Sequence, residues 1–183
     1  MKNTLFVFAL LLVALSNAQT CNTGCPTGQV FKFFSDNTHT VVGPAKPSGG
    51  LAVYNDFIHS AWLKNYGDAK WISDEPRVLV TPGADTNRFF SKVINLPCAP
   101  SIAAAKITAD NSYWTFVNGV AVTTPGCFDV TERNFNVIRD CNLSGYFNAG
   151  ANLVQFKVRN FPQGGGNWST NPTGLLYTLN ITA

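Results

Sequence analysis

The sequence predicts an all-β fold, an antiparallel sandwich of two sheets. About nine short segments alternate apolar with polar residues, and clusters of Gly, Pro, Asn and Asp separate them. No helical heptad and no internal repeat interrupts this pattern. The chain contains 14 Phe, and only 13% of its residues are charged. Such a composition suits two sheets that bury their facing sides against each other.

The clearest local signal is Asn118-Gly119, which lies between the apolar runs 114–117 and 120–123. Both turn residues tolerate the positive φ angles of a type I′ turn, so this stretch predicts a tight hairpin. A third alternating run at 103–109 precedes it, and the turn residues 110–112 stand between. We therefore expect these three strands to form one meander.

The same alternation and turn signals predict further strands. Strands are expected at 30–34 and 38–42, joined as a hairpin through Ser35-Asp36-Asn37, and again at 77–80 and 88–96.

The last two strands alternate most cleanly. Their apolar residues should face the core, and Lys157 and Arg159 should face water. The expected core residues here are Phe156, Val158, Leu175, Tyr177 and Leu179.

Several stretches resemble galactose-binding-like jelly-roll modules, the sandwiches appended to many glycoside hydrolases. The stretch 109–119 (ADNSYWTFVNG) is similar to the "ADD–x–Y–x–V–Y–V–NG" motif of that family. Further similar stretches follow in the family's order: 90–97 (FSKVINLP), 129–131 (DVT), 150–153 (GANL) and 171–176 (NPTGLL). The resemblance implies a jelly roll from about residue 30 onward, with 51–72 as an ordered loop over one end. These motifs are mostly structural, so they indicate the fold more than the ligand.

The first residues read as a secretory signal. Lys2 precedes an apolar run at 5–15 that is too short to span a bilayer. Ser16-Asn17-Ala18 then supplies the small residues of a cleavage site, so the mature chain should begin at Gln19. An uncleaved membrane anchor is the alternative interpretation. No other apolar run in the sequence is long enough to span a membrane.

The expected organisation is a cleaved signal peptide at 1–18, an N-terminal arm at 19–29 and one jelly-roll domain at 30–183. We expect a secreted protein. The formal net charge is +3, without a cluster of Lys or Arg, which argues against a nucleic-acid partner.

In a secreted protein, cysteines can form disulfides and sequons can carry N-linked glycans. The five cysteines should mostly pair in an oxidising compartment, and one is left over. Cys127 and Cys141 are expected to close the irregular stretch between them. Cys21 and Cys25 then compete for Cys98 or pair with each other, and the sequence leaves this open. Zinc is disfavoured, because no Cys-x₂-Cys pair exists. The N-glycosylation sequons start at Asn142, Asn167 and Asn180.

Catalytic and metal-binding patterns are thin. His39 and His59 are the only histidines, Glu75 and Glu132 the only glutamates, and no Gly-x-Ser-x-Gly elbow is present. We therefore expect a protein that is not an enzyme.

No cofactor is expected either. Ca²⁺ is a weak alternative, because Asp36, Asp110 and Asp129 lie at expected strand ends, but no Asp-x-Asp-x-Asp-Gly loop holds them. Turn formation is the expected role of these three residues.

A sugar site is the best small-ligand hypothesis, because it requires an aromatic platform beside amide groups. The Gly-rich loop 161–172 offers Trp168 with Gln163 and Asn160 as candidate carbohydrate-binding residues. A glycan on Asn167 would cover that platform. Trp62 and Trp71 are instead expected to be packing anchors.

Assembly is the competing hypothesis. Trp114 and Phe116 point to one side of their strand, and Tyr113 and Val117 point to the other, so the strand is apolar on both sides. One side is core, and the other needs a cover, which another part of the chain, a glycan or a neighbouring subunit could supply. With the odd cysteine, this makes a structural or adhesive subunit of an extracellular assembly the leading expectation. A soluble carbohydrate-binding module is the alternative.

Overall fold

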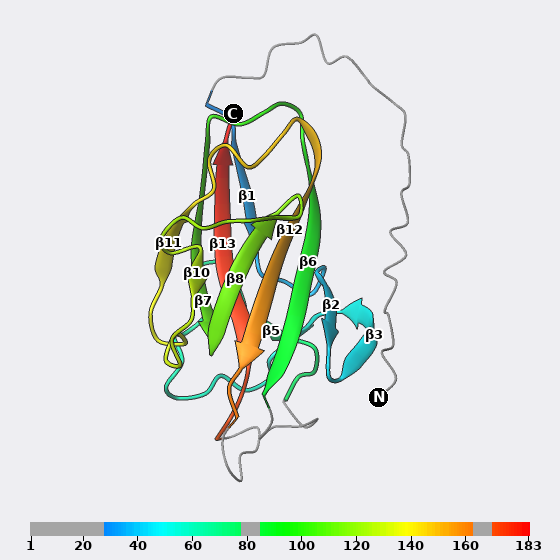
Figure 1. Ribbon diagram of the computed structural model, residues 1–183, viewed down its shortest axis with the longest axis vertical. Coiled ribbons are helices and arrows are strands. Elements are labelled where there is room, and N and C mark those ends of the chain that lie inside the picture. The colour runs from blue at the N-terminus through cyan, green and yellow to red at the C-terminus, as the bar shows by residue number, and fades with distance from the viewer. Residues whose placement is uncertain (1–27, 78–84, 163–169) are drawn as a thin grey trace, which may run out of the picture.

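The computed structural model describes residues 28–77, 85–162 and 170–183. The described chain contains 13 strands and no helix, arranged as two antiparallel sheets (Figure 1). Within these residues, no helix is long and apolar enough to cross a membrane. The predicted all-β sandwich is confirmed.

One sheet has six strands and is built around the C-terminal strand. Its order is β11 (Arg139–Asn142), β7 (Ile102–Asp110), β13 (Gly174–Thr182), β5 (Ile72–Ser73) and β4 (Val53–Tyr54), and β1 (Val30–Phe34) pairs with β13 beside β5.

The other sheet has seven strands, and β8, β12 and β6 lie side by side in it (Figure 1). Its order is β10 (Phe128–Asp129), β8 (Ser112–Val117), β12 (Gly150–Asn160), β6 (Thr86–Leu96), β2 (Thr40–Gly43) and β3 (Lys46–Leu51), and β9 (Val120–Ala121) pairs with β8.

The core lies between the inner faces of the two sheets, as the alternation predicts. The rings of Phe156 and Tyr177 meet there, 4.4 Å apart, and join β12 to β13 across the sandwich. The other expected core residues are buried as well: Val158, Leu175 and Leu179. Lys157 and Arg159 do lie on the outer face, but both are only half-exposed, because each side chain lies over a neighbouring aromatic ring.

The predicted three-stranded meander is wrong. β7 belongs to the six-stranded sheet and β8 to the seven-stranded sheet, so the chain crosses the sandwich at Asp110-Asn111. Both strands are apolar toward the same core, and alternation alone does not say which sheet receives each strand. The hairpin at Asn118-Gly119 is confirmed, with φ angles of 53° and 79°.

The predicted hairpin of the first two strands is also wrong. β1 pairs with β13, whereas β2 pairs with β3 and β6 in the opposite sheet. The turn at 35–37 therefore connects the two sheets. As at the β7–β8 corner, alternation alone does not say which sheet receives each strand. The strand predicted at 88–96 lies within β6, and most of the one predicted at 77–80 lies outside the described residues.

A disulfide joins the two sheets at one edge. It links Cys127, directly before β10, to Cys141 in β11, which confirms that predicted pair. Cys98 is also disulfide-bonded. Cys21 and Cys25 lie outside the described residues, so the question of an odd thiol stays a prediction.

Candidate functional site

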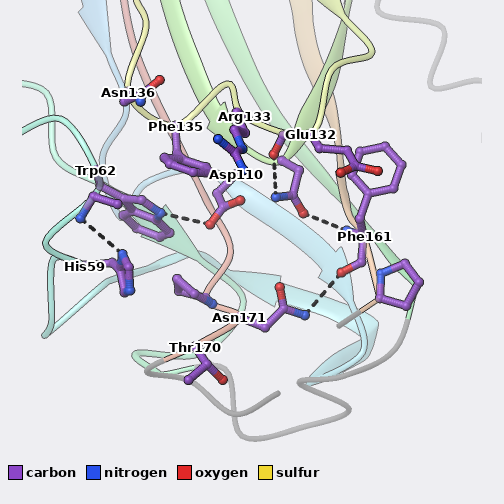
Figure 2. Close-up of a pocket in the computed structure, with 14 residues that line it drawn as sticks. His59, Trp62, Asp110, Glu132, Arg133, Phe135, Asn136, Phe161, Thr170 and Asn171 are labelled. Atoms are coloured by element: carbon purple, nitrogen blue, oxygen red, sulfur yellow. Dashed lines mark hydrogen bonds between the residues drawn. The ribbon is translucent and has the colours of Figure 1, made fainter. Parts of the chain in front are cut away.

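A pocket of about 490 Å³ opens at the end of the sandwich where the chain crosses from β7 to β8 (Figure 2). Its walls come from the loop between β4 and β5, the loop between β10 and β11, and the described ends of the 161–172 loop. The lining residues are His59, Ala61, Trp62, Asp110, Asn111, Glu132, Arg133, Phe135, Asn136, Phe161, Pro162, Thr170, Asn171 and Pro172.

The corner residues Asp110 and Asn111 hold these loops together. The Asn111 side chain donates from Nδ2 to the carbonyl of Glu132 (2.9 Å) and accepts at Oδ1 from the backbone N–H of Phe161 (2.7 Å). Thr173 Oγ1 donates to the carbonyl oxygen of Asp110 (2.6 Å). The motif that resembles "ADD" therefore fixes the pocket walls through hydrogen bonds.

The Asp110 side chain is a buried carboxyl group with one committed oxygen. Trp62 Nε1 donates to Oδ2 (2.8 Å), while Oδ1 has no hydrogen-bond partner, and the residue is 3% exposed. Burial raises the pKa of this carboxyl to about 7, although the hydrogen bond from Trp62 acts in the opposite direction. Figure 2 shows the Asp110 carboxyl group pointing toward the Trp62 indole, joined to it by a dashed line.

Two stacked tryptophans pack at the wall of the pocket. Trp62 and Trp71 stack with ring centres 4.1 Å apart, and Trp71 Nε1 donates to the carbonyl of Leu63 (2.8 Å). Gly174 permits this packing, because a Cβ there would lie 3.1 Å from Trp71 and 3.2 Å from Trp62. Both tryptophans are buried packing anchors, as predicted, and Trp62 also lines the pocket.

The loop between β10 and β11 has a fixed backbone. Three of its carbonyl groups accept hydrogen bonds from three other parts of the chain. The pairs are Asn111 Nδ2 to Glu132 (2.9 Å), Thr108 Oγ1 to Asn134 (2.6 Å) and the N–H of Leu63 to Phe135 (3.0 Å). The side chains of Glu132, Arg133 and Asn136 line the pocket and make no hydrogen bond or ion pair with described residues. The loop thus presents uncommitted polar groups from a rigid frame.

Aromatic and proline rings supply the apolar part of the wall. Phe135 packs against the Trp62–Trp71 cluster, and Phe161 is half-buried beside Pro162. The guanidinium of Arg159 lies 4.6 Å from the centre of the Phe161 ring and holds that ring in place. This mixture of rings and polar groups is typical of small-ligand sites.

The loop predicted to carry the sugar site does border this pocket. Both of its described ends, 161–162 and 170–172, contribute lining residues. Among the individual candidates, Asn160 is fully buried at the end of β12 and is not among the lining residues. Gln163, Asn167 and Trp168 lie outside the described residues.

The contribution of the β10–β11 loop to the pocket does not follow from the sequence, in which 131–145 has the pattern of an irregular insertion. The polar run from Glu132 to Asn136 was the available signal, but polar loops are common and no motif marks this one.

The three aspartates considered for Ca²⁺ do not come together. Asp36 pairs with Lys92, Asp129 pairs with Arg139, and Asp110 accepts from Trp62. No group of three or more His, Cys, Asp or Glu side chains that could hold a metal ion occurs in the described parts of the chain.

The two histidines have different surroundings. His39 is buried, with Nε2 2.7 Å from the Tyr177 hydroxyl, and burial lowers its pKa to about 4. His59 lies at the pocket, where its Nδ1 accepts the N–H of Ala61 (3.2 Å). No Ser or Cys is among the residues that line this pocket in the described chain.

Solved structures share this fold. A family 35 carbohydrate-binding module from Clostridium thermocellum has a TM-score of 0.47 and 11% identity, over 84% of this chain and 99% of that one. A β-glucuronidase from Ruminococcus gnavus has a TM-score of 0.50 and 10% identity, over 87% of this chain and 29% of the enzyme. A Podospora anserina β-(1,4)-mannanase described as GH26-CBM35 has a TM-score of 0.44 and 8% identity, over 85% and 27%.

The β-glucuronidase match, at a TM-score of 0.50, is a likeness of fold alone, and it agrees with the jelly-roll fold that the resemblance implied. The chain spans nearly the whole of the carbohydrate-binding module but less than a third of the two enzymes. No protein-family model and no curated protein sequence matches it.

Proposed function

We propose that this protein is a secreted, non-catalytic carbohydrate-binding module whose site is the pocket at the β7–β8 corner. One observation carries the proposal: aromatic rings and uncommitted polar side chains line one pocket on a tethered backbone. Sugars present apolar ring faces and hydroxyl groups side by side, so this mixture complements them. The cavity volume is in the range of small-ligand pockets.

Glycan binding by the purified protein tests the proposal. The wild type should be retained on a glycan array, and Phe161→Ala should weaken retention about tenfold or more, because it removes a stacking ring. Phe128→Ala is the matched control, since Phe128 is an exposed ring in β10 that does not line the pocket. The proposal fails if the folded wild type binds no glycan, or if both variants bind alike. Trp168→Ala tests the sequence-based candidate in the same assay.

A second candidate function is a subunit of an extracellular assembly, which the outer face of the seven-stranded sheet favours. One cross-strand row on this face reads Phe128, Trp114, Lys157, Phe89 and Val42 over five neighbouring strands. Lys157 Nζ lies 5.0 Å from the centre of the Trp114 ring and 6.0 Å from that of Phe89. Phe128, Phe89 and Val42 are exposed.

Exposed rings of this kind mark contact surfaces in many soluble proteins. Light scattering on the native protein separates the two candidates. A monomer that binds glycans supports the module alone, and a defined oligomer supports assembly.

A further inference from the structure

The charged groups of the pocket bear on which sugars it accepts, provided that the proposed carbohydrate binding holds. Four lining residues carry titratable or charged side chains: His59, Asp110, Glu132 and Arg133. They come from the β4–β5 loop, the β7–β8 corner and the β10–β11 loop. The remaining described lining residues are neutral.

Three of these groups leave little net charge. Glu132 and Arg133 are adjacent in the chain, exposed, and opposite in sign. His59 Nδ1 accepts the backbone N–H of Ala61. The two carboxyl groups and the guanidinium together carry no net charge when Asp110 is protonated, and one negative charge when it is ionised.

When Asp110 is ionised, its unpaired oxygen adds to the negative charge of the pocket and disfavours anions. Oδ1 is buried without a partner at the pocket's inner end. In that ionised state, a ligand carboxylate brought close to it would meet a second carboxylate, with Glu132 also lining the pocket. Arg133 alone would have to compensate both, and an incompletely paired anion in a partly desolvated site is costly.

Hydroxyl groups suit the same side chains better. Glu132 accepts hydrogen bonds, Arg133 donates them, and Asn136 does both. Because a sugar hydroxyl is both donor and acceptor, neighbouring hydroxyls can pair with Glu132 and Arg133 together. Because the loop backbone is already tethered, the entropy lost when these groups engage a ligand is mainly that of the side chains themselves.

We propose that the pocket selects neutral, hydroxyl-rich sugars over acidic ones, and that Glu132 and Arg133 read hydroxyl groups on neighbouring ring carbons. Asp110 is a positioning residue, since its Oδ2 holds the Trp62 indole that forms part of the wall.

The test compares two glycan sets in one titration series. Neutral mannan, galactan and xylan oligosaccharides are set against oligogalacturonate and alginate oligosaccharides, first with the wild type. We expect neutral ligands to bind at least about tenfold more tightly, the effect of one charge-assisted hydrogen bond. Glu132→Gln should weaken neutral binding and reduce the discrimination against acidic ligands. Arg133→Gln should weaken neutral binding by a similar factor.

Asp68→Asn and Lys64→Gln are matched controls, because both residues are exposed and neither lines the pocket. Tighter binding of acidic glycans by the wild type overturns the inference, as does wild-type behaviour of both pocket variants. If glycans bind in a Phe161-dependent way without this preference, the inference fails and the proposed function stands. If no glycan of either class binds, both fail.

Discussion

The two outer faces of the sandwich differ, although the inner faces are alike. On the six-stranded sheet, Asn142, Ala104 and Asn180 form one cross-strand row, and all three are exposed polar or small residues. On the seven-stranded sheet, the comparable row is Phe128, Trp114, Lys157, Phe89 and Val42. The six-stranded sheet buries Ala, Ile, Leu and Tyr inward and the seven-stranded sheet buries Phe, Tyr, Val, Ile and Leu, so both inner faces are apolar and the core does not require this difference. The contrast therefore concerns what each face meets outside the domain.

The six-stranded face suits water and glycans. Two sequon asparagines, Asn142 and Asn180, flank Ala104, whose small side chain leaves room above the sheet. The seven-stranded face carries no sequon within its described strands and exposes rings instead. Four experiments, taken from the largest expected effect to the smallest, would break or sharpen this comparison.

The largest expected effect on the free energy of unfolding comes from comparing an inner-face ring with an outer-face ring of the seven-stranded sheet. Phe156 is 1% exposed and packs on Tyr177, whereas Phe89 on the neighbouring strand is 44% exposed. Phe156→Ala should lower the free energy of unfolding by about 3–5 kcal/mol, and Phe89→Ala by less than about 1 kcal/mol. Urea denaturation measures both. A loss below about 1 kcal/mol for Phe156→Ala would contradict its place in the core.

The second experiment concerns the corner where the chain passes from one sheet to the other. The pKa of Asp110 is about 7 in the folded state and 3.8 in a model peptide, so the folded state keeps a proton that the unfolded chain loses. Folding stability should therefore fall as the pH rises from about 4 to about 7, and stay level above that.

The variant Asp110→Asn removes this ionisation and can still accept from Trp62. It should match the wild type near pH 4 and exceed its stability at pH 8, by an order of 2–4 kcal/mol at most. Thermal unfolding of both proteins from pH 4 to 8 measures the difference. Parallel curves for the two proteins would show that Asp110 ionises normally in the fold.

The third experiment tests whether the aromatic face is a contact surface. Replacing Phe89 and Phe128 with Ser should shift an oligomer toward monomer in light scattering, with little change in unfolding temperature, because both rings are exposed. Thr178→Ala, on the outer face of β13, is the matched change on the opposite sheet and should leave assembly unchanged. If the double variant forms the same oligomer as the wild type, this face is not part of the interface.

The smallest expected effect on stability comes from removing the two sequons on the outer face of the six-stranded sheet. When the protein is made in a eukaryotic secretory host, Asn142→Gln and Asn180→Gln should each lower its mass by one glycan. Unfolding temperatures should change little, because both side chains are exposed. Intact mass spectrometry reads the result, and unchanged masses would show that this face is left bare.

Local signals in the sequence were enough for much of the fold. The alternation from Phe156 to Arg159 and from Leu175 to Leu179 predicted which residues face the core, because side chains in a strand point to opposite faces in turn. It did not predict the burial of Leu176, which lies on the outer face and packs with Trp62 and Trp71. Asn118-Gly119 predicted its hairpin, because only residues that tolerate positive φ fit such a turn. The proximity of Cys127 and Cys141 was also predicted from their spacing.

Only the tertiary structure decided which of the two sheets each strand joins. Alternation says that β7 and β8 each have a core face, and it is silent on which side of the core they lie. The Asp110-Asn111 corner sends them to opposite sheets through hydrogen bonds from Thr173 and to Glu132, residues distant in the sequence. The pocket depends on the same long-range contacts, so Glu132, Arg133 and Asn136 could not be recognised from their own stretch. The sequence by itself determined strands, turns and burial, which are set by neighbouring residues, and the tertiary structure decided sheet membership and the site, which are set by distant ones.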